Sequence, residues 1–336
     1  MITSEKPTII LRRRDVRRLL PIAECIAGVE LAFAAHAAGR TIAPGVLGTH
    51  VDGGGFHIKA AGLLDPIDAE PLYAAKINAN FPANPTVRGL PTIQGVLALF
   101  NAVDGRLLAL MDSIEITSLR TAAATAVAAK HLAPERGRVT IVGCGEQSAY
   151  QLRALACVRD LERVSAFDVA AHRAERFAAQ MRGELDVDVH VLRHFADDAA
   201  TSNIWITCTP SHRWFLGREH VAAGAFVAAV GADNPEKQEI EPELLATSAV
   251  IADILEQCAT IGDTHHALNA GVMRRDDVRA ELSDIVCGRI RGRRSDDETV
   301  IFDSTGTALQ DVAAAAVVYE RALAANDGFA IDLGAS

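Results

Sequence analysis

A glycine-rich turn, GCGEQS, joins the short apolar segment VTIV to a segment whose apolar residues recur at helical spacing. Gly143 and Gly145 match the first two glycines of the pattern G-x-G-x-x-G, and Ser148 replaces the third. The first glycine permits a tight turn, the second lets backbone approach a pyrophosphate, and a small third residue lets helix and strand pack closely. Amides at the start of the helix then bind phosphate. The alternative is a turn that binds nothing, but its place between strand and helix favours a dinucleotide site.

Asp168 lies at the end of the next strand-like segment, 25 residues after Gly143. An acid at this position accepts hydrogen bonds from both ribose hydroxyls and repels a 2′-phosphate. The spacing therefore favours NAD over NADP. Arg173 and Arg176 follow soon afterwards and weaken that preference.

Several basic side chains are suited to binding a carboxylate. Lys76 lies in the strand-like run YAAKINANFP, which we expect to face a cleft. His57 and Lys59 project to one face of their strand at a period of two. Arg120 begins an alanine-rich helix and can offer a guanidinium fork. Each has a structural alternative: Lys76 as a surface lysine, His57 and Lys59 as part of an exposed strand face, and Arg120 as one partner of an ion pair at a helix end.

Hydride chemistry on an amino or imino acid also needs a group that exchanges a proton with nitrogen or water. Asp233 directly follows a buried strand, at the edge of a parallel sheet where ligands bind. We expect it away from water, with a raised pKa suited to acid–base work; the alternative is a turn or capping aspartate. Asp303 and Ser304 either line a pocket or close a turn, and His265-His266 is interpreted as structural.

Composition excludes several classes of protein. The chain has 336 residues and a mass of 35.7 kDa, with 49% hydrophobic and 23% charged residues, which is typical of a folded globular protein. The formal net charge is −10, so we expect no nucleic-acid partner. No uncharged apolar run is long enough for a bilayer, so we expect no membrane partner.

The six cysteines are scattered, without CxxC or Cys/His clusters. We therefore expect no metal site and free thiols in a reducing compartment. The first residues, MITSEKPTII, lack the apolar run of a signal peptide. The expected location is the cytoplasm.

The periodicity of apolar residues changes along the chain. Residues 42–110 alternate in the manner of strands, and Asp104-Gly105 predicts a hairpin turn. ITSLRTAAATAVAAKHLA predicts a helix that ends before Pro134. From residue 138 strands and helices alternate, which predicts a doubly wound parallel sheet.

The predicted fold is therefore α/β: a Rossmann-type domain with a doubly wound parallel sheet, plus an α+β domain. We expect the Rossmann domain, which binds NAD(P), at residues 131–307. Residues 1–130 form the other domain, and the C-terminal helix, residues 308–336, returns to complete it.

Taken together, the segments resemble the ornithine cyclodeaminase and mu-crystallin family along nearly the whole chain. The resemblance rests on NANFPANPTVRGLPTIQG, ALMDSIEITSLRTAAATAVAAKHLA, IVGCGEQS, VGADNPEKQEI and IFDSTGTALQD, in the family's order and spacing. It implies a substrate-binding and dimerisation domain beside the NAD(P) domain, and a homodimer. Members include cyclodeaminases, alanine dehydrogenases and reductases of imino acids.

The resemblance also implies roles for matching residues. Lys76 matches the lysine that contacts substrate, and Asp233 matches the general acid/base. Ser304 and Thr305 match positions beside the nicotinamide and substrate. The expected catalytic residues are Lys76 and Asp233, and the expected substrate contacts are Lys59, Lys76, Arg120 and Thr305. The expected cofactor contacts are Thr92, Arg120, Gly143, Gly145, Glu146, Gln147, Asp168, Thr209, Val230, Gly231, Lys237 and Ser304.

One departure from the family concerns the substrate carboxylate. Members often carry an arginine shortly after a proline, but here TIAPGVLGTH has Gly45 at the expected position. The next strand instead carries Lys59, and our hypothesis is that this lysine takes over part of the carboxylate clamp. A lysine offers a point charge in place of a bidentate fork, so the preferred acid need not be ornithine or alanine.

The leading expectation is an NAD(H)-dependent reductase or dehydrogenase that interconverts an imino acid (ketimine) and an L-amino acid. A cyclodeaminase, which converts a diamino acid into a cyclic imino acid and ammonia, needs the same first half-reaction. A third alternative is a ligand-binding protein of the mu-crystallin type. The presence of both Lys76 and Asp233 disfavours it, since a pure binder needs no pair for proton transfer.

Overall fold

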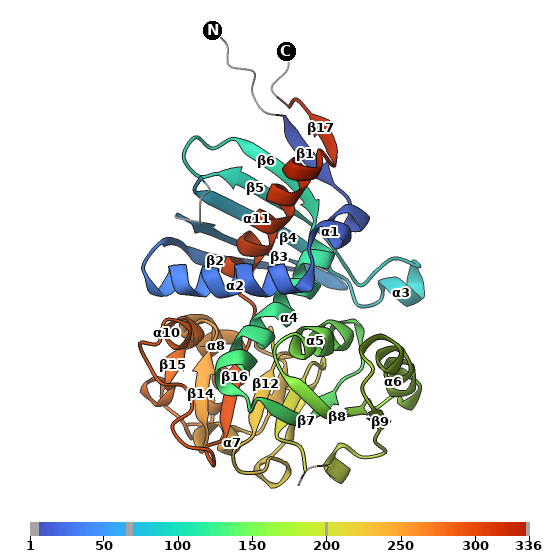
Figure 1. Ribbon diagram of the computed structural model, residues 1–336, viewed down its shortest axis with the longest axis vertical. Coiled ribbons are helices and arrows are strands. Elements are labelled where there is room, and N and C mark those ends of the chain that lie inside the picture. The colour runs from blue at the N-terminus through green and yellow to red at the C-terminus, as the bar shows by residue number, and fades with distance from the viewer. Residues whose placement is uncertain (1–6, 65–69, 199–200, 334–336) are drawn as a thin grey trace. The chain divides into compact units, whose positions relative to one another are not determined.

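The computed structural model describes residues 7–64, 70–198 and 201–333 (Figure 1). The chain divides into two compact units, Met1–Arg120 with Thr307–Ser336 and Thr121–Gly306. The first division falls inside a continuous helix, α4 (Ser113–Leu132), whereas the sequence places it near residue 130, at that helix's end. The pattern of residue types shows where a helix ends, whereas the division into units depends on which segments pack together.

The first unit contains, in its described residues, a seven-stranded sheet of order β17-β1-β6-β5-β4-β3-β2. Its strands are β1 (Thr8–Leu11), β2 (Thr41–Val51), β3 (Gly54–Leu63), β4 (Leu72–Asn80), β5 (Ile93–Asn101), β6 (Leu107–Asp112) and β17 (Phe329–Ile331). Its helices are α1 (Arg13–Leu19), α2 (Ile22–Ala37), α3 (Asn84–Val87) and α11 (Ala308–Ala325), with the start of α4. The predicted hairpin joins β5 to β6, where Gly105 has a φ of +80°.

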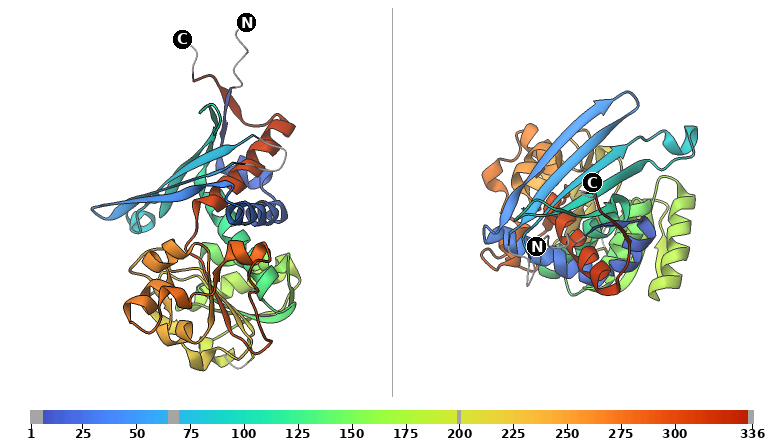
Figure 2. Two further views of the ribbon diagram at one scale, coloured as in Figure 1. Left: turned by 90° about the vertical axis from the view of Figure 1, so that its left-hand side faces the viewer. Right: turned by 90° about the horizontal axis from the view of Figure 1, so that it is seen from above.

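The two faces of this sheet differ in composition. Lys59, Lys76 and Leu97 are direct cross-strand partners in β3, β4 and β5, so their side chains share one face. α11 packs across β3 and β4 on that face, and α2 packs against α11 (Figure 2). The opposite face carries an apolar row in which Ile77 is 43% and Val96 39% exposed.

The chain's end departs from the expected helix over residues 308–336. α11 stops at Ala325, because Asn326 takes the left-handed conformation at φ 50° and Gly328 has a φ of +97°. β17 follows and pairs antiparallel with β1. The last helix thus returns to the first unit, but its C-terminal segment is an edge strand.

The second unit contains a sheet that has eight strands within the described ranges, in the order β15-β14-β16-β12-β10-β7-β8-β9. Neighbouring strands in this sheet are parallel, which confirms the predicted doubly wound fold. Its strands are β7 (Arg136–Val142), β8 (Asp160–Phe167), β9 (Val189–Val191), β10 (Ile204–Thr207), β12 (Phe226–Ala229), β14 (Ala249–Ala252), β15 (Ala280–Glu281) and β16 (Val300–Asp303).

The connections of the second unit include short elements that the sequence pattern does not predict. A separate two-stranded sheet pairs β11 (His212–Leu216) with β13 (Gln238–Ile240). The remaining helices are α5 (Glu146–Ala156), α6 (Ala171–Leu185), α7 (Pro242–Ala246), α8 (Leu255–Ile261), α9 (Asp263–Asn269) and α10 (Leu282–Val286). Short 3-10 turns span Phe195–Asp198, Arg218–His220 and Arg275–Asp277.

The strand order places a topological switch point between β7 and β10. After β7 the chain adds β8 and β9 on one side, then crosses back to add β10 on the other. Ligands of open parallel sheets bind at the carboxyl ends of strands that flank such a point. The core beneath it is apolar, with Trp205, Val227 and Ile301 fully buried.

The sequence also predicts free cysteines and no segment long and apolar enough for a bilayer. All six cysteines lie in the described ranges and are free thiols, as predicted. Within those ranges no single helix has the length and apolarity needed to span a membrane, although α1 and α2, bent at 82°, pass that test as a pair.

Close packing in the first sheet can be tested at a glycine of β5. A Cβ at Gly95 would lie 2.6 Å from Ser113 Oγ, with the Ile77 carbonyl oxygen closer still. We expect Gly95→Ala to lower the free energy of unfolding by about 1–3 kcal/mol through overpacking. Gly48→Ala in β2 is the control, since its Cβ would meet His57 at an ordinary 3.7 Å. Equal urea midpoints for the two variants would contradict the prediction.

Candidate active site

A buried ionic cluster joins three elements of the first unit. Lys76 of β4 donates from Nζ to Asp311 Oδ1 at 2.8 Å. Arg120 of α4 donates from Nε to the same oxygen at 2.9 Å. Lys76 is 3%, Arg120 5% and Asp311 1% exposed. One carboxylate oxygen therefore orients two cations that the sequence assigned to substrate binding.

Local structure explains how this carboxylate is held. Asp311 lies in the first turn of α11, where the helix dipole favours an acid, and the Thr307 hydroxyl caps the same helix. The neighbouring Gln310 accepts from Arg120 Nη1 at 2.8 Å. Sequence reasoning gave no role to Gln310 or Asp311. The available signal was a glutamine and an acid that open an otherwise alanine-rich, apolar helix.

Burial dominates the electrostatics of the cluster. Desolvation lowers the pKa of Lys76 to about 7, against the attraction of Asp311, and Arg120 and Lys59 lower it further. Burial alone would raise the pKa of Asp311, but the charges of Lys76 and Arg120 hold it below its usual value. Burial raises the pKa of the neighbouring Cys25 thiol to about 12, so this thiol is neutral. The cluster thus combines one anion with one permanent and one titratable cation.

Lys59 lies on the same face as this cluster. It is half-buried and is paired directly with Lys76 across the strands. Gly45, which stands where the family's arginine is expected, is opposite Ala60, so this position belongs to the other face of the sheet. The residue across from Lys59 on the cluster's face is Val46.

Thr92 precedes β5 and is half-buried. Its carbonyl oxygen accepts from the Phe81 amide at 2.8 Å, which ties the end of β4 to the start of β5. That bond gives Thr92 a structural role in the first unit. Its expected contact with a cofactor stays a prediction.

The glycine-rich turn of the second unit has the geometry that a dinucleotide pyrophosphate requires. Gly143 has a φ of +95°, and a Cβ there would lie 2.8 Å from both the Cys208 carbonyl oxygen and Thr209 Cγ2. Its amide donates to Phe167 O at 2.8 Å. Only glycine meets both constraints at this point between β7 and β10.

The start of α5 is open where a phosphate would approach. No described atom lies within 4 Å of a Cβ built on Gly145, the exposed N-cap. Glu146 and Gln147 form the first turn behind it. Ser148 is fully buried and donates from Oγ to Gly145 O at 2.6 Å, which accounts for a small residue at the third position. These residues fit a dinucleotide.

Asp168 follows β8 and anchors the same turn. Its Oδ2 accepts from the Cys144 amide at 2.8 Å and its Oδ1 from the Ala170 amide at 2.8 Å. Arg173 and Arg176 are exposed on α6. The carboxylate therefore has a structural role besides the expected one toward ribose.

Glu239, which sequence reasoning missed, organises the ends of β10 and β12. Its carboxylate accepts from the Thr207 hydroxyl at 2.7 Å, the Thr209 amide at 2.6 Å and the Gly231 amide at 2.8 Å. Burial raises the pKa of Glu239, while these bonds oppose the shift. The expected cofactor contacts Thr209 and Gly231 are thus held by one buried acid, and Val230, which directly follows β12, is 8% exposed.

Asp253 holds the segment after β16 by hydrogen bonds, as Glu239 holds the ends of β10 and β12. It accepts from the Thr305 hydroxyl at 2.8 Å and from the Gly306 amide at 2.7 Å. Ser304 is 3% exposed, and its Oγ has no hydrogen-bond partner in the described part of the chain. Asp303, the last residue of β16, is fully buried, and desolvation raises its pKa to about 7. Asp253 therefore fixes a turn whose expected ligand contacts are Ser304 and Thr305.

Asp233 differs from its expected surroundings. Its side chain is 56% exposed and accepts from Lys237 Nζ at 2.7 Å. It does follow β12 at the carboxyl edge of the sheet, but it is not shielded from water. What covers a loop end depends on segments distant in the sequence, which a strand pattern cannot reveal.

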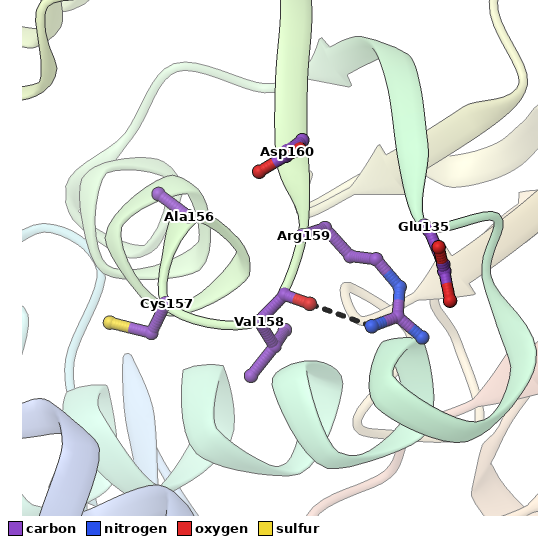
Figure 3. A pocket seen from close by; sticks show the side chains of 6 residues that line it. All are labelled: Glu135, Ala156, Cys157, Val158, Arg159 and Asp160. Atoms are coloured by element: carbon purple, nitrogen blue, oxygen red, sulfur yellow. Dashed lines mark hydrogen bonds between the residues drawn. The ribbon is translucent and has the colours of Figure 1, made fainter.

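A shallow hollow of about 410 Å³ lies at the opposite edge of this sheet (Figure 3). It is lined by Glu135, Ala156, Cys157, Val158, Arg159 and Asp160. β7 and β8 begin here, and Arg159 donates to Val158 O at 2.6 Å. The hollow is thus separate from the carboxyl ends that carry the candidate residues.

Fold and site together define a two-unit α/β protein with a dinucleotide-type turn in one unit and a buried cationic cluster in the other. The chain belongs to the ornithine cyclodeaminase/mu-crystallin family, whose model matches residues 6–326. This match confirms the resemblance seen in the sequence.

Alanine dehydrogenase of Archaeoglobus fulgidus is 36% identical over 323 residues, covering 96% of this chain and 97% of that protein. An archaeal alanine dehydrogenase dimer with bound NAD superimposes with a TM-score of 0.91 at 36% identity, over 97% and 99% of the two chains. Thermococcus litoralis Delta(1)-pyrroline-2-carboxylate reductase, solved with NADH and L-proline, gives 0.91 at 28% identity, over 96% and 100%. Iminosuccinate reductase of Paracoccus denitrificans, solved with NAD+, gives 0.89 at 28% identity, over 98% and 100%.

The two glycines of the turn make separable predictions. Gly143→Ala should lower the free energy of unfolding by about 2 kcal/mol or more, because its φ and its contacts both exclude a Cβ. Gly145→Ala should change it by less than about 0.5 kcal/mol. We expect the latter to weaken NADH binding at least about tenfold, since its methyl group projects where backbone meets pyrophosphate. Denaturation and NADH titration measure the two effects, and an unchanged NADH affinity in Gly145→Ala would contradict the second.

Lys76 should give stability a distinct pH dependence in the absence of substrate. Its pKa is about 7 in the folded chain against 10.5 as its ordinary value. Between these values the unfolded state binds more protons, so the free energy of unfolding should rise with pH, by at most about 1.4 kcal/mol per pH unit. Below pH 7 this contribution is constant. Lys76→Met should reduce the slope between pH 7 and 10, whereas Lys130→Met, at an exposed position of α4, should retain it. Equal slopes in denaturant titrations would refute the assignment.

Proposed function

We propose that this protein is an NAD(H)-dependent reductase, or dehydrogenase in the reverse direction, that interconverts an imino acid and an L-amino acid. The observation that carries the proposal is the buried Lys76–Asp311–Arg120 cluster in a chain that also carries the dinucleotide-type turn. Relatives named for alanine, pyrroline-2-carboxylate and iminosuccinate chemistry support this reaction class.

The cluster is suited to holding a substrate carboxylate. Lys76 has three donors and uses one on Asp311, and Arg120 uses Nε and Nη1 on Asp311 and Gln310. Two cations share one anion, so the trio with Lys76 protonated has one excess positive charge. A substrate carboxylate neutralises that charge and favours the protonated form of Lys76. Lys59 and Thr305 complete the proposed substrate contacts.

The proposed cofactor is NAD, with NADP less favoured because Asp168 follows β8. When bound, NADH supplies the hydride that the imine carbon takes up as the C=N π pair moves to nitrogen, leaving NAD+. Gly143, Gly145 and the first turn of α5 would hold the pyrophosphate. Thr209, Gly231 and Ser304, fixed by buried acids, would line the nicotinamide end.

Asp233 is the proposed proton-exchanging residue. During reduction the nitrogen must gain a proton, and in the reverse direction it must lose one. Asp233 stands at the carboxyl end of β12, and its exposure lets it exchange protons with water between turnovers. Lys237, its ion-pair partner at 2.7 Å, holds the carboxylate in place.

We also propose that the protein acts in the cytoplasm as a homodimer. The apolar row on the open face of the first sheet supports a second copy as the partner: Leu47 is 60%, Ile77 43% and Val96 39% exposed. Such patches mark association surfaces. The similar archaeal alanine dehydrogenase is described as a dimer.

A cyclodeaminase is the second candidate, because the family's description names one and the same carboxylate clamp serves both reactions. The two differ in overall balance. A reductase consumes NADH, whereas a cyclodeaminase returns the hydride and releases ammonia without net NADH change. A pure ligand-binding protein would bind substrate without either change.

The test follows absorbance at 340 nm with NADH and a panel of cyclic imines and of 2-oxo acids with ammonium. We expect consumption with at least one substrate class. Lys76→Met should lower kcat/KM at least about 30-fold, since removing one partner of a buried charged contact costs about 2–5 kcal/mol. Lys130→Met should behave as the wild type.

Two results would reject the reductase. Absence of NADH consumption across the panel, with ammonia released from a diamino acid, would establish the cyclodeaminase. Tight ligand binding by the intact protein without any turnover would establish the binding protein.

A further inference from the structure

Lys59 is a basic residue whose position in the sheet is defined by strand pairing. It is directly opposite Lys76 in the β3–β4 pairing, on the face that carries the ionic cluster. Side chains at such positions start with their Cβ atoms about 4.5–5.5 Å apart. Like charges directly opposite one another repel, and an anion bound between two such lysines attracts both.

The charge of Lys59 is felt by the cluster without being part of its core. Lys59 lowers the pKa of Lys76, but by less than desolvation and Arg120 do. It also lowers the pKa of Asp311, by less than Lys76 and Arg120 do. Lys76 is 3% exposed, whereas Lys59 is half-buried. Lys59 is therefore nearer to solvent than Lys76 on the same face of the sheet.

The next row along the strands is also polar. His57 is opposite Asn78, and Asn78 accepts from the Ser113 hydroxyl at 2.6 Å. Polar side chains thus continue on this face beyond Lys59, where an apolar substrate tail would find few partners. A substrate whose far end is charged suits this row better.

We infer that Lys59 binds a second carboxylate, so that the preferred substrate is a short imino dicarboxylic acid. The inference rests on the proposed function and names its substrate class. Lys76 and Arg120 hold the carboxylate beside the imine carbon, and Lys59 holds the distal one, in place of the share in the first clamp that the sequence suggested. Three or four carbon–carbon bonds of about 1.5 Å separate the carboxyl carbons of a four- or five-carbon diacid, which is comparable to the spacing of the two strands.

The test compares three 2-oxo acids with ammonium and NADH: oxaloacetate, 2-oxoglutarate and pyruvate, each corrected for the reaction without enzyme. One of the two diacids should have a kcat/KM at least about tenfold above that of pyruvate. Lys59→Met should lower the value for that diacid at least about tenfold and the value for pyruvate less than about threefold. Lys59→Arg, which keeps the positive charge, should restore most of the diacid activity.

A binding measurement complements the kinetics. With NAD+ present, L-aspartate or L-glutamate should raise the Tm of the wild type more than L-alanine does, and Lys59→Met should lose that difference. A preference for pyruvate, or an equal loss on all three acids in Lys59→Met, would overturn the inference while leaving the reductase intact. No NADH oxidation with any oxo acid or cyclic imine would instead reject the proposed function itself.

Discussion

The first unit depends on a single carboxylate oxygen shared by two buried cations. Asp311 Oδ1 accepts from Lys76 and from Arg120, and so joins a strand, the start of one helix and the start of another. Without that anion, two positive charges would be buried side by side, at a cost of several kcal/mol. The same bonds fix where the cations point, so the stability of this cluster and the proposed substrate binding depend on one interaction. α11 must therefore return to this sheet after the chain has completed the second unit.

The second unit also positions its candidate ligand contacts with buried acids, but these acids are not paired with cations. Its strand ends carry buried acids that accept from backbone amides and hydroxyls instead of from cations. Glu239 fixes Thr209 and Gly231, and Asp253 fixes Thr305 and Gly306. Backbone donors disperse the negative charge without adding a cation, which suits a region proposed to bind a pyrophosphate. In both units the residues expected to touch ligands are positioned by acids that have structural partners.

Local patterns could be predicted from the sequence, and contacts between distant segments could not. The glycine turn, the hairpin at Gly105 and the parallel sheet follow from neighbouring residues, because turn conformation and periodicity are local properties. Asp311 was missed because its partners are 235 and 191 residues away. Glu239 was missed because its role appears only when the ends of β10 and β12 meet β13. The exposure of Asp233 likewise depends on what covers a loop, which spacing does not encode.

The register of strand pairing decides which face of the sheet a side chain occupies, and residue identity alone does not reveal it. Gly45 was matched to a missing arginine by its distance from a proline, yet strand pairing assigns it to the face opposite Lys76. A shift of one residue moves a side chain to the other face of a sheet, so a count along the chain must be checked against the pairing. The same reasoning strengthens the case for Lys59, whose direct pairing with Lys76 puts both lysines on one face. Under the proposed assignment of Lys59, the charge on that face distinguishes one acid substrate from another, whereas the motif that marks the family does not.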